Sequence, residues 1–69
     1  MASIYQIRIK EHLDRQLEDW FEDMRITHSA DGTTTLEGPV VDVAALYGLI
    51  AKARDLGLTL IAVCQVEAI

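Results

Sequence analysis

The spacing of the apolar residues switches along this chain between two residues and three to four, and this alternation constrains the fold more than any other feature. In "SIYQIRIK", Tyr5, Ile7 and Ile9 share one parity and polar residues lie between them. Such alternation predicts a strand with one buried face. From Leu13 onward the apolar residues recur at i, i+4, i+7, i+8 and i+11, which predicts an amphipathic helix over residues 13–23.

Two short segments on either side of Asp31-Gly32 alternate again. The first is "MRITHS", and the second, "TTTLEG", is rich in β-branched threonine. An Asp-Gly pair between two such segments predicts a β-hairpin.

The stretch Gly38-Pro39-Val40-Val41-Asp42 precedes a second helical segment and allows two interpretations. Free N–H groups at a helix start attract anions, so the stretch could hold a ligand. Asp42, however, is a good N-cap whose carboxylate would repel an anion, and Pro39 cannot donate to a sheet ladder and so marks the end of the strand. We interpret the stretch as a strand-to-helix connector.

The second helix carries an apolar stripe from Leu46 to Leu56. We expect it to stop at Gly57, because glycine has no Cβ and adopts the left-handed conformation that ends many helices. Leu58 can then supply the hydrophobic contact of a Schellman motif.

The last segment, "LTLIAVCQV", is apolar on both parities, which predicts a strand covered on both faces. The order is therefore β-α-β-β-α-β within a single domain, residues 1–69. It predicts an α+β fold of the ferredoxin-like βαββαβ type, a four-stranded antiparallel sheet with two helices on one face. Because the other sheet face is then open, we expect a homo-oligomer, favouring a dimer, joined through that face. The expected interface residues are Ile4, Leu60, Ala62, Cys64 and Val66.

Composition and charge exclude several classes of protein. With 51% hydrophobic and 25% charged residues, the chain is expected to form a packed domain. Six acidic residues against one arginine between residues 11 and 23 carry the whole net charge of −5. This argues against nucleic-acid binding and favours a basic protein partner. No apolar run approaches the roughly 18 residues of a membrane span, and a single cysteine suits a cytoplasmic protein.

The acidic residues of the first predicted helix are the candidate partner-binding residues: Asp14, Glu18, Asp19, Glu22 and Asp23. Two carboxylate pairs in this group stand at i, i+4. One helix supplies too few oxygens for calcium or magnesium, so we interpret the group as a solvated acidic face that a partner can contact.

Residue types that could ligate a metal or act as a catalyst are present but scattered. His12, His28 and Cys64 include no pair at a ligand spacing, and no spacing joins a nucleophile to a base. We therefore expect no metal, no cofactor and no catalytic residue.

The aromatic residues favour packing over ligand stacking. Trp20, Phe21 and Tyr47 lie on or beside helical apolar stripes, where core packing is expected. The outward strand positions carry Arg and Thr but lack the aromatic rings on which RNA bases stack.

The run from "GPVVD" through "AALYGLIAKARDLGLTLIAVCQVE", with "HLD", "WFEDMRITH" and "DGTTTLEGPV" upstream, resembles a family of small stand-alone uncharacterised bacterial proteins. The likeness covers nearly the whole chain. It implies a free-standing bacterial cytoplasmic domain and brings no activity, ligand or catalytic residue with it.

Three hypotheses of function follow. The first is a small non-enzymatic oligomeric module that binds a partner protein through its acidic helix face. The second is a small-molecule-binding or sensor domain with a pocket at a subunit interface or between sheet and helix. The third, an enzyme, ranks last because no catalytic constellation can be assembled.

Overall fold

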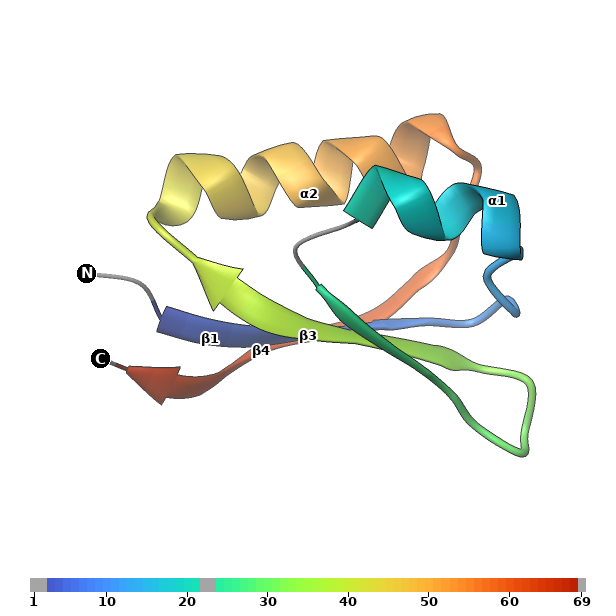
Figure 1. Ribbon diagram of the computed structural model, residues 1–69. Coiled ribbons are helices and arrows are strands. Elements are labelled where there is room, and N and C mark those ends of the chain that lie inside the picture. Colours follow the sequence, from blue (N-terminus) through green and yellow to red (C-terminus); the bar gives the residue numbers. More distant parts are fainter. Residues whose placement is uncertain (1–2, 22–23, 69) are drawn as a thin grey trace.

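The computed structural model describes residues 3–21 and 24–68 of the chain, and they form one sheet with two helices (Figure 1). The elements are, in chain order, β1 (Ser3–Ile9), α1 (Arg15–Glu18), the 3-10 helix η1 (Asp19–Phe21), β2 (Arg25–His28), β3 (Thr34–Val40), α2 (Val43–Asp55) and β4 (Leu60–Ala68). The sheet order is β2-β3-β1-β4, and all neighbouring strands are antiparallel. In Figure 1 both helices lie on the same side of the sheet. The predicted α+β class and four-stranded antiparallel sheet are confirmed.

The core lies between the sheet and the helices. The predicted alternation of β1 is confirmed, since Ile7 and Ile9 are 1% and 0% exposed and Tyr5 packs against the same cluster. The buried apolar residues come from β1, η1, β3 and α2 and from the segments just before α1 and β2: Ile7, Ile9, Leu13, Phe21, Met24, Leu36, Val40, Leu46 and Ala53.

The predicted hairpin forms between β2 and β3. Gly32 has φ +90°, a left-handed conformation that glycine adopts without strain. The Asp31 carboxylate accepts hydrogen bonds from the Thr33 hydroxyl at 2.7 Å and the Thr33 N–H at 3.0 Å. These two bonds hold the pKa of Asp31 below its usual value.

Both predicted ends of α2 are confirmed. Asp42 is the N-cap, and its carboxylate accepts a hydrogen bond from the Ala45 N–H at 2.8 Å. At the other end Gly57 has φ +77°, and the Leu58 N–H donates to the Ala53 carbonyl at 2.9 Å. This 6→1 bond, with the one from Gly57 to Arg54 at 3.0 Å, completes a Schellman motif.

The first helix is much shorter than the predicted span of residues 13–23. It begins only after Asp14, whose extended backbone and side-chain acceptance from the Gln16 N–H make it the N-cap. After Glu18 the chain tightens into η1, where the tighter helical turn directs Phe21 inward and Trp20 outward. Phe21 is 2% exposed and Trp20 53%, so the prediction that both pack in the core is wrong for Trp20.

The prediction that Pro39 ends the strand is also wrong. β3 continues to Val40, and Pro39 lies opposite Ile4 of β1. Because the pairing of β3 with β2 reaches only Glu37, one side of β3 is already an open edge at Pro39, and an edge position tolerates a residue without an N–H.

The expected β4 interface residues, Leu60, Ala62, Cys64 and Val66, share one parity in the sequence but do not share one face of the sheet. Ile61 and Val66 have no opposite residue on β1, because the register shifts at each of them. Each shift is a β-bulge, which exchanges the two faces for the residues that follow. Leu60 therefore lies opposite Ile9 on the helix side, whereas Ala62 lies opposite Arg8 on the open face.

Tyr47 is 64% exposed, so the expectation of core packing is wrong for this residue of α2.

Within the described ranges, none of the helices combines the length and the hydropathy that crossing a bilayer would require.

Candidate functional site

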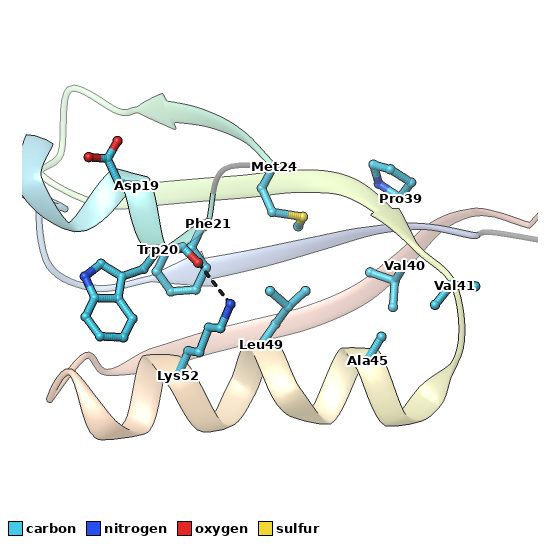
Figure 2. A pocket seen from close by; sticks show the side chains of 10 residues that line it. All are labelled: Asp19, Trp20, Phe21, Met24, Pro39, Val40, Val41, Ala45, Leu49 and Lys52. Carbon is cyan, nitrogen blue, oxygen red and sulfur yellow. Dashed lines mark hydrogen bonds between the residues drawn. The ribbon is translucent and has the colours of Figure 1, made fainter.

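An apolar groove lies between η1 and α2, beside the end of β3 (Figure 2). Its volume is about 710 Å³, within the range usual for ligand sites. The lining residues come from η1, the end of β3 and one face of α2: Asp19, Trp20, Phe21, Met24, Pro39, Val40, Val41, Ala45, Leu49 and Lys52.

The groove has a buried floor and an exposed rim. Phe21 and Val40 are each 2% exposed and Met24 is 8% exposed, so these side chains are held by the core. Trp20 and Val41 are 53% and 66% exposed and stand at the rim. A rigid apolar floor beneath an exposed indole is an arrangement that can bury an apolar group of a ligand.

One polar contact joins the two walls of the groove. The Lys52 ammonium donates to the Trp20 carbonyl oxygen at 3.2 Å, which links α2 to η1 (Figure 2). The Asp19 carboxylate is the other charged group of the lining. None of the ten described lining residues carries a hydroxyl, thiol or imidazole group, so the reactive side chains of this set are the Asp19 carboxylate and the Lys52 amine.

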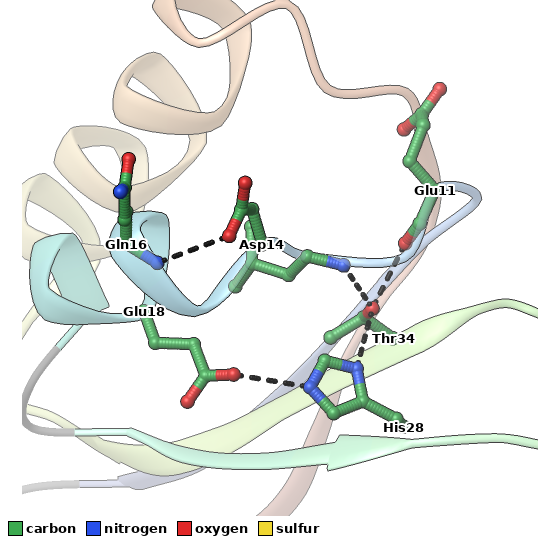
Figure 3. A network of polar contacts seen from close by, with 7 residues as sticks. Glu11, Asp14, Gln16, Glu18, His28 and Thr34 are labelled. Carbon is green, nitrogen blue, oxygen red and sulfur yellow. Dashed lines mark hydrogen bonds and ion pairs between the residues drawn. The ribbon is translucent and has the colours of Figure 1, made fainter.

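A polar network at the other end of α1 centres on Thr34, which is 0% exposed (Figure 3). Its hydroxyl accepts from the Leu13 N–H at 2.9 Å and donates to the Glu11 carbonyl at 2.9 Å. The Glu11 side chain accepts in turn from the Thr59 N–H at 2.7 Å, and this hydrogen bond lowers the pKa of Glu11. Thr34 thus fastens the loop after β1 to the start of β3.

His28 extends this network. Its Nε2 lies 3.1 Å from Glu18 Oε2 and its Nδ1 lies 3.4 Å from the Thr34 hydroxyl, while its ring stacks on His12 at 4.1 Å between centroids. Which atom donates in each of the two His28 contacts depends on which ring nitrogen carries a proton. The network ties α1 to the hairpin, and we interpret it as structural.

The model of a family described as a domain of unknown function (DUF8691) matches residues 4–64. The chain belongs to this family. No curated protein and no solved structure matches it. The description of the DUF8691 family assigns no activity, so the function of this member has to be argued from its own groove and surfaces.

The three acidic candidates that the structure describes in this DUF8691 domain have separate roles. Asp14 caps α1, Glu18 contacts His28, and Asp19 lines the groove. Glu22 and Asp23 lie outside the described residues. The structure therefore connects one of the described candidates, Asp19, directly to a possible binding site.

The expected interface residues are divided by the β4 bulges. Ile4, Ala62 and Cys64 lie on the open face, where Ala62 and Cys64 are opposite Arg8 and Gln6. The other two leave that face. Leu60 packs against the core cluster on the helix side, and Val66 lies in a bulge and is 51% exposed.

Several contacts escaped the sequence interpretation because they join residues far apart in the chain. His12 and His28 had no ligand spacing, yet their rings stack; among the described residues, however, no three His, Cys, Asp or Glu side chains come together to hold a metal ion. Thr34 could have been found, since it is a polar residue on the same parity as buried Leu36. The stretch interpreted as a connector does cap α2, and it also supplies groove residues such as Val41.

Proposed function

We propose that this domain is a non-enzymatic binding module that takes an apolar side chain of a basic partner peptide into the groove between η1 and α2. The observation that carries the proposal is the groove itself, an apolar volume of about 710 Å³ with a buried floor. Interfaces draw most of their energy from a few apolar or aromatic groups seated in such depressions.

Charge supports a basic partner. The net charge of −5 is concentrated in residues 11–23, and three residues of this segment, Asp19, Trp20 and Phe21, line the groove. Asp19 lines the groove, and the neighbouring Glu18 is one third exposed. Negative potential at a rim speeds the association of a positively charged partner and weakens as salt is added.

Lys52 supports a second candidate, a small apolar molecule with an anionic group. Its ammonium is the cationic group among the described lining residues, and it lies at the wall of a groove of ligand size. An anion could take up the donors of this ammonium that the Trp20 carbonyl leaves free.

The two candidates make opposite predictions for charge substitutions. The reporter is Trp20, the single tryptophan of the chain, whose half-exposed indole should shift its fluorescence to the blue when the groove is filled. The probes are a synthetic amphipathic Lys/Leu peptide and the apolar anion dodecanoate. Asp19→Lys should weaken peptide binding several-fold and leave dodecanoate binding intact or stronger, whereas Lys52→Gln should weaken dodecanoate binding alone.

Asp55→Lys is the matched control, because it makes the same charge change at an exposed residue of α2 outside the groove lining. The peptide proposal fails if Asp19→Lys and Asp55→Lys have equal effects on peptide binding. Both candidates fail if neither probe changes the Trp20 emission.

We also propose that the domain has the ferredoxin-like split βαβ arrangement. The support is the strand order β2-β3-β1-β4, in which α1 connects β1 to β2 across β3, and α2 connects β3 to β4 across β1. An experimental structure with another strand order would overturn it. We propose in addition that the protein is cytoplasmic. The support is its single cysteine, Cys64, which is free and exposed.

A further inference from the structure

The two edges of the sheet differ in a way that bears on assembly. The β2 edge has four residues and carries a charged residue, Arg25. The β4 edge has nine residues, contains neither proline nor lysine, and has Glu67 as its single charge. Proteins usually protect an open edge by shortness, proline or charge, because its unpaired N–H and C=O groups pair readily with another strand. β2 has such protection and β4 largely lacks it.

The side chains of β4 are exposed as well as apolar. Ile61, Val63 and Val66 are 49%, 38% and 51% exposed. Two bulges lie at Ile61 and Val66, and the regular stretch Ala62–Gln65 between them keeps an undistorted edge. This stretch can accept another strand.

The neighbouring flank of α2 continues this apolar surface. Val43 and Tyr47 are one helical turn apart and are 57% and 64% exposed. At 100° per residue they point away from Ala45 and Lys52, which face the groove beside η1 and β3. Because the sheet order is β3-β1-β4, the flank opposite the groove is the one toward β4.

The open sheet face is a poorer candidate for association. Its β1 and β3 positions include Gln6, Arg8, Thr35 and Glu37, which are paired across the two strands. The Gln6 amide already donates to the Glu37 carboxylate at 3.3 Å. Packing a second sheet on this face would take the charged groups of Arg8 and Glu37 out of water, which is costly.

We propose that two copies of this chain pair antiparallel along β4, so that two sheets join into one and the Val43–Tyr47 flanks of the two α2 helices face each other. A strand edge is complementary to its own copy about a two-fold axis. The charges of β4 are compatible with the pairing of two copies. In a pairing centred on the stretch Ala62–Gln65, the two Glu67 side chains lie at opposite ends of the joined strands, so like charges do not meet even though each chain carries −5.

The surface that this dimer would bury is small. A nine-residue strand is about 30 Å long and the sheet and helix layers together are about 20 Å deep, so each copy would bury about 600 Å². The total of about 1,200 Å² is at the lower end of specific interfaces. We therefore expect a dimer that dissociates in the micromolar range, and the groove stays accessible because it lies on the opposite flank of α2.

The first experiment is sedimentation equilibrium of the full chain from about 1 µM to about 1 mM, which spans the expected dissociation constant. Tyr47→Lys should raise that constant at least about tenfold, since it places a charge at the centre of the helix-helix contact. Trp20→Lys is the matched control, because Trp20 is an exposed aromatic residue of η1 at the groove, away from the proposed interface. It should leave the dissociation constant of the dimer unchanged. Circular dichroism checks that both variants fold.

The second experiment separates the β4 edge from the open face. Amide hydrogen exchange followed by NMR at low and high concentration should show every second amide of β4 becoming protected as the dimer forms, because only edge pairing gives these amides new acceptors. Unchanged β4 exchange in a dimer, together with dissociation by Ile4→Lys and not by Tyr47→Lys, would assign the interface to the open face and overturn the proposal. A monomer at all concentrations would overturn it as well.

Discussion

Replacing Thr34 with valine removes the hydroxyl at the centre of the polar network and keeps the shape and β-branching of the side chain. Thr34 is 0% exposed, and its hydroxyl bonds the Leu13 N–H and the Glu11 carbonyl, both at 2.9 Å. Valine can satisfy neither backbone group. Because Leu13 is itself 0% exposed, water cannot easily replace the lost acceptor.

The expected loss follows from these two hydrogen bonds. Each contributes about 1 kcal/mol net, and an unsatisfied buried donor costs about 1–3 kcal/mol, so Thr34→Val should lower the free energy of unfolding by about 2–3 kcal/mol. For a domain of 69 residues the whole stability is about 3–10 kcal/mol. At about 4–8 °C per kcal/mol, the melting temperature should fall by roughly 10–20 °C.

Urea unfolding and thermal melts, both followed by circular dichroism, measure the effect. Thr34→Ser keeps the hydroxyl and loses one methyl, so it should cost less than Thr34→Val. Thr35→Val is the matched control in the same strand, because Thr35 lies opposite Arg8 on the open face and should change stability by less than about 0.5 kcal/mol. A Thr34→Val protein as stable as the wild type, or a Thr34→Ser protein less stable than Thr34→Val, would refute the assignment.

Four further substitutions test the two ends of α2, its interior and the pH dependence. Asp42→Ala should cost about 1 kcal/mol in urea unfolding, because it removes the N-cap of α2. Gly57→Ala should cost about 1–2 kcal/mol since the residue has φ +77°, whereas Gly48→Ala inside α2, where an added Cβ meets nothing within 4 Å, should stabilise by up to about 1 kcal/mol. The hydrogen bond from Thr59 depresses the pKa of folded Glu11, so its stabilisation is present above the unfolded value near 4.5 and is lost as the pH falls through the folded value. Melting temperatures of wild type and Glu11→Gln should therefore differ at neutral pH and converge in acid.

The elements that local chemistry specifies were predictable from the sequence. α2 has a carboxylate cap, a full apolar stripe and a C-terminal glycine, and its ends agree with those signals at Asp42 and Gly57. The hairpin needs a left-handed residue, and Gly32 supplies it where Asp-Gly predicted a turn. In both cases a few adjacent residues determine the backbone, so no distant contact is needed.

The faces of β4 could not be predicted for the opposite reason. A strand that is apolar on both parities has little preference for either face, so its register is decided by its neighbour. Here β1 determines it, and two bulges leave Ile61 and Val66 without opposite residues. The stacking of His12 on His28 was equally inaccessible, because it depends on where the loop after β1 meets the end of β2.

The short first helix and the open groove have one cause. On a regular helix over residues 13–23, Trp20 would stand seven residues after Leu13 and share its inward face, so the indole would occupy space between that helix and α2. The change to the 3-10 helix η1 gives the inward position to Phe21, which is 2% exposed, and turns Trp20 to the rim. A phenyl ring fills less volume than an indole, so space remains above Phe21 and beside Leu49. The groove thus depends on which of two adjacent aromatic residues faces the core.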